Sequence, residues 1–243
     1  MTGKTPNVEI DEAVEIVRAG TDAGVLITCE HASERLPSPW RWSARDARLV
    51  GTHWAFDLGA ADLAREYAQA IGGVAVLSRF SRLVADPNRP EDSPTLFRAL
   101  AEGEPVELNA AIDDDDRARR LDLYHRPFHA AVAREVGASR APWLLAMHTF
   151  TPVYEGQRRT LELGVLFDRE EAMAMRLVDG LAAHGWRVAP NEPYSGRDGL
   201  IHVVDTHARA HGRRAIEIEV RQDLAVDPAF RARFVTALAA LLR

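Results

Sequence analysis

Short apolar runs alternate along this chain with longer segments of helical periodicity. Each run has the length of a strand and is bounded by polar residues, glycine or proline, which is typical of strands in a buried sheet. Predicted strands cover residues 25–28, 74–77, 143–147, 163–167 and 215–220. In the last of these, apolar and polar side chains alternate, so that strand is expected to have one polar face.

Apolar positions three and four residues apart predict helices between the strands. These helices cover residues 58–71, about 116–136, 170–184 and the segment after Asp227. The alternation of strands and helices predicts an α/β fold with three layers, α/β/α, and a mixed, largely parallel sheet. No repeat or linker divides the chain, so residues 1–243 are expected to form one domain, with a flexible tail over residues 1–8.

Composition limits the classes of partner. The chain has 47% hydrophobic and 27% charged residues and a formal net charge of −6. It has no tract rich in Lys and Arg, so we expect neither a nucleic-acid partner nor an anionic membrane surface. A single cysteine, no apolar signal core and no run of about 18 apolar residues predict a cytoplasmic protein. The oligomeric state stays open.

Polar side chains that could bind a metal or take part in catalysis follow two of the predicted strands. His31 comes after the strand at 25–28, and His148 ends the strand at 143–147. Glu219 lies on the polar face of the strand at 215–220. Ligands of open α/β sheets bind beyond the carboxyl ends of the strands. Two histidines, a carboxylate ligand and a free carboxylate are what a hydrolytic zinc site requires, so we expect one here.

The third ligand has two candidates from the residues alone. Glu34 forms an H-x-x-E pair with His31, and Asp57 stands at the start of the next predicted helix, whose dipole favours an anion. A second metal centre is not expected at His125 and His129, although their spacing matches H-E-x-x-H. Arg126 occupies the place of the glutamate in that motif.

Cys29 lies two residues before His31 and could suggest a nucleophile with a histidine base. Two residues apart in an extended strand, the pair lacks the geometry of a nucleophile and its base, and no cationic setting is visible to lower the thiol pKa. We interpret Cys29 as a buried, small apolar residue.

Six ordered segments carry a resemblance to a known family. They are LITCEHASERLP, THWAFDLGA, SRFSRLVADPNRP, MHTFTP, NEPYSGRDG and IEVRQDL, and they extend from Val25 to about Leu224. Together they resemble the N-formylglutamate amidohydrolase family, whose fold is similar to that of zinc carboxypeptidases and aminoacylases. The resemblance implies a phosphorylase/hydrolase-like (zinc-peptidase-like) α/β fold and a metal-dependent hydrolase of linear amides.

The resemblance also implies roles for the candidate residues. His31 and His148 match the histidine ligands, and Glu219 matches the catalytic glutamate. The family usually has Asn where this chain has Glu34, which favours Asp57 as the third zinc ligand, with Glu30 still open.

The remaining motifs suit an acidic N-acyl amino acid. The pair Asn88 and Arg89 resembles the element with which zinc carboxypeptidases hold a terminal carboxylate, and a guanidinium can grip a carboxylate with two hydrogen bonds. Arg82 is expected to stabilise the oxyanion of the reaction. Further expected substrate-binding residues are His129, Tyr194, Ser195, Arg197 and Arg221.

The predicted function is hydrolysis of N-formyl-L-glutamate to formate and L-glutamate by metal-activated water, with Glu219 moving the protons. The alternatives are a hydrolase of another N-acyl or N-carbamoyl amino acid, and a metal-free relative that binds acidic metabolites.

Overall fold

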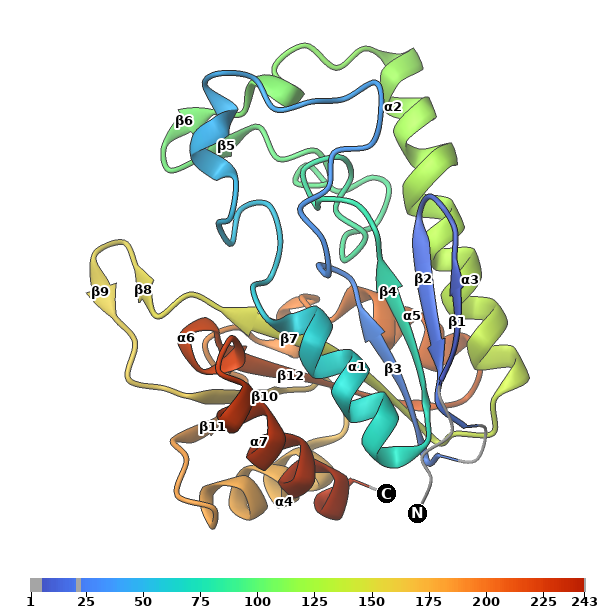
Figure 1. Ribbon diagram of the computed structural model, residues 1–243, viewed down its shortest axis with the longest axis vertical. Coiled ribbons are helices and arrows are strands. Elements are labelled where there is room, and N and C mark those ends of the chain that lie inside the picture. The colour runs from blue at the N-terminus through green and yellow to red at the C-terminus, as the bar shows by residue number, and fades with distance from the viewer. Residues whose placement is uncertain (1–5, 21–22, 243) are drawn as a thin grey trace.

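A mixed sheet of eight strands forms the centre of the molecule, in the order β1-β2-β4-β3-β7-β12-β10-β11 (Figure 1). The computed structural model describes residues 6–20 and 23–242. The four central strands, from β4 to β12, run parallel, whereas β2 and β10 are antiparallel to their inner neighbours. The strands are β1 (Asn7–Ile10), β2 (Val14–Arg18), β3 (Val25–Cys29), β4 (Val74–Ser78), β7 (Trp143–Phe150), β10 (Leu163–Leu166), β11 (Val188–Pro190) and β12 (Arg214–Arg221).

Two short hairpins lie outside this sheet. One joins β5 (Leu100–Ala101) to β6 (Glu104–Pro105), and the other joins β8 (Val153–Tyr154) to β9 (Gln157–Arg158).

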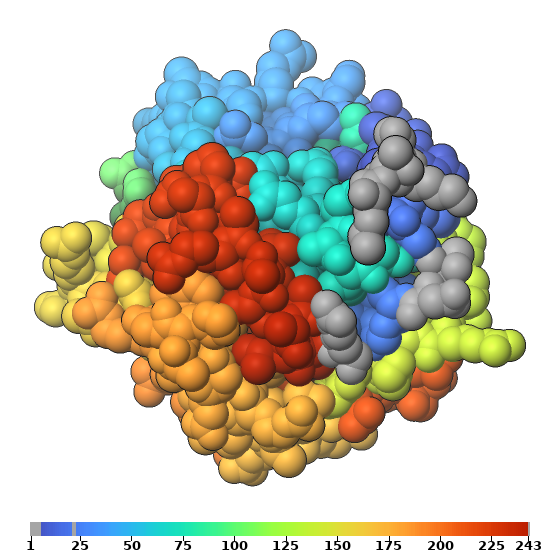
Figure 2. Space-filling view, turned by 60° about the horizontal axis from the view of Figure 1, so that its bottom comes forward, coloured from blue at the N-terminus to red at the C-terminus, as the bar shows by residue number. Residues whose placement is uncertain are grey.

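Helices cover both faces of the sheet and complete the three layers. On one face α7 packs between α1 and α4, and the three helices form the middle and lower part of the surface seen in Figure 2. On the other face α3 and α5 pack against the central strands. The helices are α1 (Ala60–Ile71), α2 (Asp114–Arg120), α3 (Arg126–Ala138), α4 (Glu171–Ala182), α5 (His202–Ala210), α6 (Gln222–Ala225) and α7 (Pro228–Leu241). The predicted α/β/α architecture with a mostly parallel sheet is confirmed.

The alternation of side chains along the strands divides the core between the two faces. Leu145 and Met147 of β7 join the apolar cluster beneath α1, α4 and α7, and so do Ile216 and Ile218 of β12. Successive side chains of a strand point to opposite faces, so His148 of β7 and the glutamates of β12 point to the other face. The pattern that builds the core therefore also places these polar groups together.

The strand and helix predictions hold for the long elements. All five predicted strands are present, and the helix expected over residues 116–136 runs without a gap through α2, a π-helical turn (Leu121–His125) and α3, with right-handed helical angles at both joints. Pro127 lies in the first turn of α3; it has no N–H to donate to the preceding turn, and the π-helical turn lies directly before it.

The tail predicted over residues 1–8 is wrong for Asn7 and Val8, because both belong to β1. This strand is held to β2 by main-chain pairing, and its side chains are exposed, so no apolar pattern marks it. Residues 1–5 lie outside the described part of the chain. Among the described residues, no helix combines the length and the apolar character needed to cross a membrane.

Candidate active site

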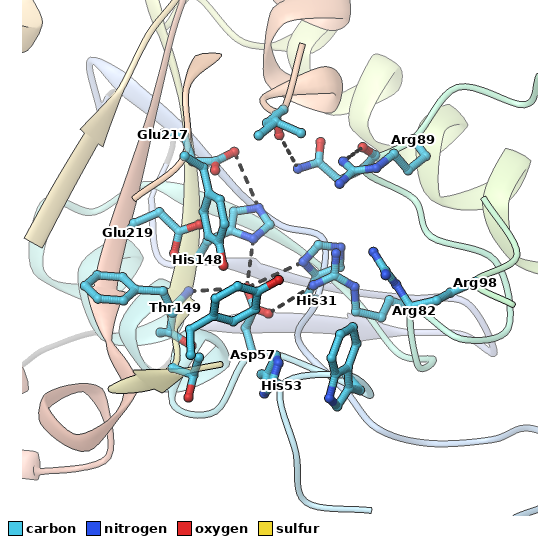
Figure 3. A pocket seen from close by; sticks show the side chains of 17 residues that line it. His31, His53, Asp57, Arg82, Arg89, Arg98, His148, Thr149, Glu217 and Glu219 are labelled. Atoms are coloured by element: carbon cyan, nitrogen blue, oxygen red, sulfur yellow. Dashed lines mark hydrogen bonds and ion pairs between the residues drawn. The ribbon is translucent and has the colours of Figure 1, made fainter. Parts of the chain in front are cut away.

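A cavity of about 190 Å³ opens at the carboxyl ends of the central parallel strands. Its walls come from β7, β12 and the loops that follow β3 and β4. Figure 3 shows two acidic side chains of β12 on one side, several arginines on the other, and the predicted zinc-ligand residues between them. The lining residues are His31, His53, Trp54, Asp57, Arg82, Asn88, Arg89, Arg98, His148, Thr149, Phe150, Thr151, Tyr154, Tyr194, Leu200, Glu217 and Glu219.

His31 lies two residues beyond the end of β3 and is almost completely buried. Its Nε2 is 2.7 Å from Oδ1 of Asp86, and its Nδ1 is 3.5 Å from Oδ2 of Asp57. Since the carboxylate of Asp86 accepts the proton of Nε2, Nδ1 keeps its lone pair. That Nδ1 is buried and has no hydrogen-bond partner among the described residues.

His148 is arranged in the same way on β7. Its Nε2 lies 2.8 Å from Oε2 of Glu30, and its Nδ1 lies 2.9 Å from Oδ2 of Asp57. Glu30 is itself oriented by the hydroxyl of Thr28, which donates to its other oxygen at 2.6 Å. Each histidine thus has a carboxylate at Nε2 and directs Nδ1 toward the same oxygen of Asp57.

Asp57 is held in place before α1 by main-chain hydrogen bonds. Its N–H donates to the carbonyl of His31 at 2.9 Å, and its Oδ2 accepts from the N–H of Thr149 at 3.2 Å. Gly59, between Asp57 and α1, has a φ of 82°, and a Cβ there would lie 2.7 Å from the main chain of Ala225. Only glycine fits this turn without strain.

Burial opposes the ionisation of Asp57, but the proximity of His31 and His148 outweighs it and holds the Asp57 pKa below its usual value.

Two further carboxyl groups project from β12 beside His148. Glu219 is paired in register with His148, and Glu217 precedes it on the same face. One oxygen of Glu217 is 3.7 Å from Nε2 of His148. Burial raises the pKa of Glu217 to about 7, and burial together with the charge of Glu217 raises that of Glu219 well above its ordinary value. Each glutamate has one buried oxygen without a hydrogen-bond partner in the described part of the chain.

These observations test whether the site suits a metal ion. Nitrogen and oxygen atoms of His31, Asp57 and His148 lie within 4.8 Å of one another, and the same holds for His148, Glu217 and Glu219. Five buried carboxyl groups surround the two histidines. Three buried atoms of this cluster, Nδ1 of His31 and one oxygen each of Glu217 and Glu219, have no hydrogen-bond partner among the described residues. A cation satisfies both the excess of carboxylates and the unpaired ligand atoms. The set of two histidines and a carboxylate fits zinc. The remaining carboxylates fit the role of groups that hydrogen-bond to the ligands and orient them.

The opposite wall of the cavity is positively charged. Arg82 donates to Oδ2 of Asp86 at 2.9 Å and lies 3.5 Å from Oδ1 of Asp57, so its guanidinium bridges two carboxylates. Arg89 donates to the main-chain carbonyl of Asn88 at 2.7 Å. Arg98 lies over the ring of Trp54, 5.2 Å from its centre.

Asn88 and Tyr194 line the cavity as expected. The amide of Asn88 donates to the carbonyl of Leu200 at 2.9 Å and accepts from the N–H of Val203 at 3.1 Å. Asn88 therefore joins the loop after β4 to the start of α5. The cation of Arg159 lies 5.5 Å from the centre of the Tyr194 ring.

Four expected substrate-binding residues lie outside the cavity, and their own partners explain why. Ser195 accepts from the N–H of Arg197 and caps a short 3-10 turn, and Arg197 pairs with Glu171 on the surface. Arg221 is turned toward Asp223 and the main chain of residues 159–161. His129 donates to the carbonyl of Pro87 at 3.0 Å, behind the loop that carries Asn88.

The alternatives for the third ligand are also placed. Glu34 accepts from the N–H of Gly51 at 2.6 Å and does not line the cavity, and Glu30 contacts His148 at Nε2 and not at Nδ1. Asp57 is therefore the carboxylate that the two Nδ1 atoms share.

Cys29 is fully buried in the core beneath α1, and burial raises the pKa of its thiol far above the ordinary value.

Sequence reasoning missed several residues of this site. Glu217 shares the polar face of its strand with Glu219, so the alternation in residues 215–220 carried a signal for it. Asp86 lies within the segment SRLVADPNRP, but nothing in the sequence shows that it reaches His31. Arg98 has no motif around it and is brought to the cavity only by the tertiary fold.

The fold and the site together define an α/β protein whose parallel strands end in a buried histidine–carboxylate cluster, facing arginines across a small cavity. The chain belongs to the N-formylglutamate amidohydrolase family, because the family model matches residues 23–226. It is an amidohydrolase by family, as the ordered motifs indicated.

One relative has a name of the same family, and two solved structures share the fold. The N-formylglutamate deformylase of Pseudomonas putida is 30% identical over 128 residues, which are 48% of this chain and 46% of that protein. The match thus spans about half the length of this relative. The structure of gene product Atu2144 from Agrobacterium tumefaciens has a TM-score of 0.88 and 31% identity, covering 96% of this chain and 94% of that one.

An N-formylglutamate amidohydrolase from Ralstonia eutropha shares the fold, with a TM-score of 0.65, 21% identity and 96% coverage of both chains.

Proposed function

We propose that this protein hydrolyses N-formyl-L-glutamate to formate and L-glutamate at one divalent metal ion, zinc, held by His31, Asp57 and His148. The observation that carries the proposal is the convergence of two Nδ1 atoms on one Asp57 oxygen, in a chain of the N-formylglutamate amidohydrolase family. The activity named for the Pseudomonas putida relative supports the choice of substrate.

The carboxylates of Asp86 and Glu30 are proposed to orient the two histidine ligands. Asp86 and Glu30 accept the Nε2 protons of His31 and His148, which fixes the tautomer that leaves Nδ1 free to bind a metal and increases its basicity. When bound, zinc supplies Lewis acidity, which polarises a carbonyl group and lowers the pKa of water.

Glu219 is proposed as the residue that moves protons. Its carboxyl group stands beside His148 on the neighbouring strand and has an unpaired oxygen at the cavity. A cation bound beside it would favour its ionised form, in which it can accept a proton from the attacking water and return it to the departing amine. Glu217 lies on the same face of β12, and its negative charge is proposed to raise the pKa of Glu219.

The positive wall is proposed to hold the substrate. Arg89 would bind the α-carboxylate, because its guanidinium faces the cavity and has no carboxylate partner within 4.0 Å among the described residues. Arg82, on the same wall, lies 3.5 Å from Asp57, where its charge would stabilise the oxygen of the formyl group as negative charge develops.

The test is a comparison of wild type with Glu219→Gln. Formate and free amine are measured after addition of N-formyl-L-glutamate to zinc-loaded and chelator-treated protein, and bound zinc is measured by elemental analysis. We expect turnover by the zinc-loaded wild type only, and a loss of at least about 100-fold in Glu219→Gln with zinc retained, the usual contribution of a positioned acid–base group.

Glu171→Gln is the matched control, because Glu171 pairs with Arg197 on the surface. A zinc-loaded wild type that releases no formate would contradict the proposed reaction. Binding of N-formyl-L-glutamate without a metal and without turnover would instead indicate a metabolite-binding relative.

A further inference from the structure

The cavity contains two guanidinium groups that the protein itself does not neutralise. Arg82, their neighbour on the same wall, is bound by Asp57 and Asp86. Arg89 and Arg98 line the cavity as well, but neither is within 4.0 Å of a carboxylate oxygen in the part of the chain that the structure describes. A partly buried cation on the wall of a cavity needs an anion to offset its lost hydration.

The position of Arg98 is fixed by its neighbours. Its main-chain carbonyl accepts a hydrogen bond from the amide of Asn109 at 2.9 Å, and Asn109 in turn accepts from the buried Arg120 at 2.7 Å. Its guanidinium lies over Trp54, a contact that orients the planar group but uses only its face, so the N–H groups at its edge stay available. Burial and then the charge of Arg82 lower the pKa of Arg98, and the more distant charge of Asp86 offsets them only in part.

Two separate cations suit a ligand with two anions. A ligand whose only carboxylate is the α-carboxylate can pair with Arg89, but Arg98 then stays without an anion. Figure 3 shows both arginines across the cavity from Glu217 and Glu219, with His31 and Asp57 between the two sides. A ligand whose amide lies at the histidines can therefore direct both of its carboxylates toward the arginines.

We infer that Arg98 is a specificity-determining residue that binds the side-chain carboxylate of an acidic N-acyl amino acid, while Arg89 binds the α-carboxylate. The inference rests on the proposed function and adds to it the reason for a glutamate substrate. A neutral side chain of the same shape, such as that of glutamine, would leave Arg98 without an anion. The cavity would then select against the amide by the unpaired charge and not by size.

The experiment compares N-formyl-L-glutamate with N-formyl-L-glutamine, which differ only in that group. We expect wild type to have a kcat/KM for the glutamate substrate that is roughly 10- to 100-fold higher, the range of a charge-assisted hydrogen bond. Arg98→Gln should reduce this ratio to less than about threefold, and Arg98→Lys should give an intermediate ratio, because it keeps the charge without the planar fork.

Two controls separate this role from a structural one. Arg89→Gln should lower kcat/KM for both substrates and keep the ratio, because both substrates have the α-carboxylate. Arg197→Gln, on the surface beside Glu171, should keep both values. If Arg98→Gln lowers both substrates equally, Arg98 only supports Trp54 and the inference is wrong.

Binding separates this inference from the proposed function. Calorimetry with L-glutamate and L-glutamine, which do not react, measures the preference without turnover. If wild type hydrolyses neither substrate, the proposed function fails. Loss of the preference for L-glutamate in Arg98→Gln still supports the assignment of Arg98, and an unchanged preference refutes it.

Discussion

A stack of histidines behind the loop that carries Asn88 and Arg89 should make the protein sensitive to acid. His129 donates from Nε2 to the carbonyl of Pro87 at 3.0 Å, and its Nδ1 lies 3.1 Å from Nε2 of His207. A carbonyl can only accept, so Nε2 of His129 carries the proton and, in the neutral ring, Nδ1 accepts from His207. His125 binds the carbonyl of Arg89 at 2.9 Å in a similar way. Protonation of His129 at Nδ1 would break the bond from His207 and place a positive charge in this buried stack, although the bond to Pro87 could remain.

The sign and size of the effect follow from the pKa. Burial, with the charges of His125 and His207, lowers the pKa of His129 from 6.5 to about 3. An unfolded chain therefore takes up a proton on this residue below about pH 6.5, whereas the folded chain does not. The stability it contributes is complete above that pH and is lost as the pH falls from about 6.5 toward 3. At pH 5 the loss is about 2 kcal/mol, and any folded-state pKa below about 4 gives nearly the same value.

The assay is urea unfolding, followed by circular dichroism at pH 7.5 and pH 5.0 in the presence of a chelator, so that metal release does not contribute. His129→Gln keeps a donor for Pro87 but has no titrating ring. The difference between its stabilities at the two pH values should be about 2 kcal/mol smaller than that of wild type. His184→Gln, which replaces an exposed histidine, is the control and should behave like wild type. Equal losses in wild type and His129→Gln would refute the reasoning.

Two further predictions concern the metal. His148→Ala should remain folded but bind no zinc, as measured by elemental analysis of the purified variant, and retention of one tightly bound zinc would exclude His148 as a ligand. Glu30→Gln should weaken zinc binding by roughly 10- to 100-fold in competition with a chelator, because it removes the carboxylate that orients Nε2 of His148. Glu34→Gln is its control, since Glu34 contacts Gly51 away from the cavity, and equal losses in the two variants would argue against this role.

The parts of the site that lie on strands could be predicted from the sequence. His148 and Glu219 are paired on neighbouring parallel strands, and the two-residue period of a strand fixes which side chains share a face. Once both strands were located, their polar residues had to meet at one edge of the sheet. His31 follows the same rule at the end of β3.

The loop residues could not be predicted in the same way. Asp86 reaches His31 because its loop is closed by hydrogen bonds to distant segments, among them its own N–H to the carbonyl of Leu96. The segment from Asn191 to Gly199 showed its polar residues, but not that only Tyr194 among the three candidates faces the cavity. Turn geometry decides that choice, and here Ser195 serves as a cap. The strands β1, β2 and β11 and the helix α5 were missed, because short or polar elements carry little periodicity.

Asp86 connects the two halves of the site. One of its oxygens accepts from Nε2 of His31 and from the N–H of Asn88, and the other accepts from Arg82. The residue that orients a proposed metal ligand therefore also fixes the start of the loop that presents Arg89. Movement of this loop away from the cavity would have to break the contact that holds His31 in its tautomer. Because of this connection, changes on the arginine wall that displace Asp86 should affect the histidine cluster, whereas changes at Arg98, which is anchored separately through Asn109, should not.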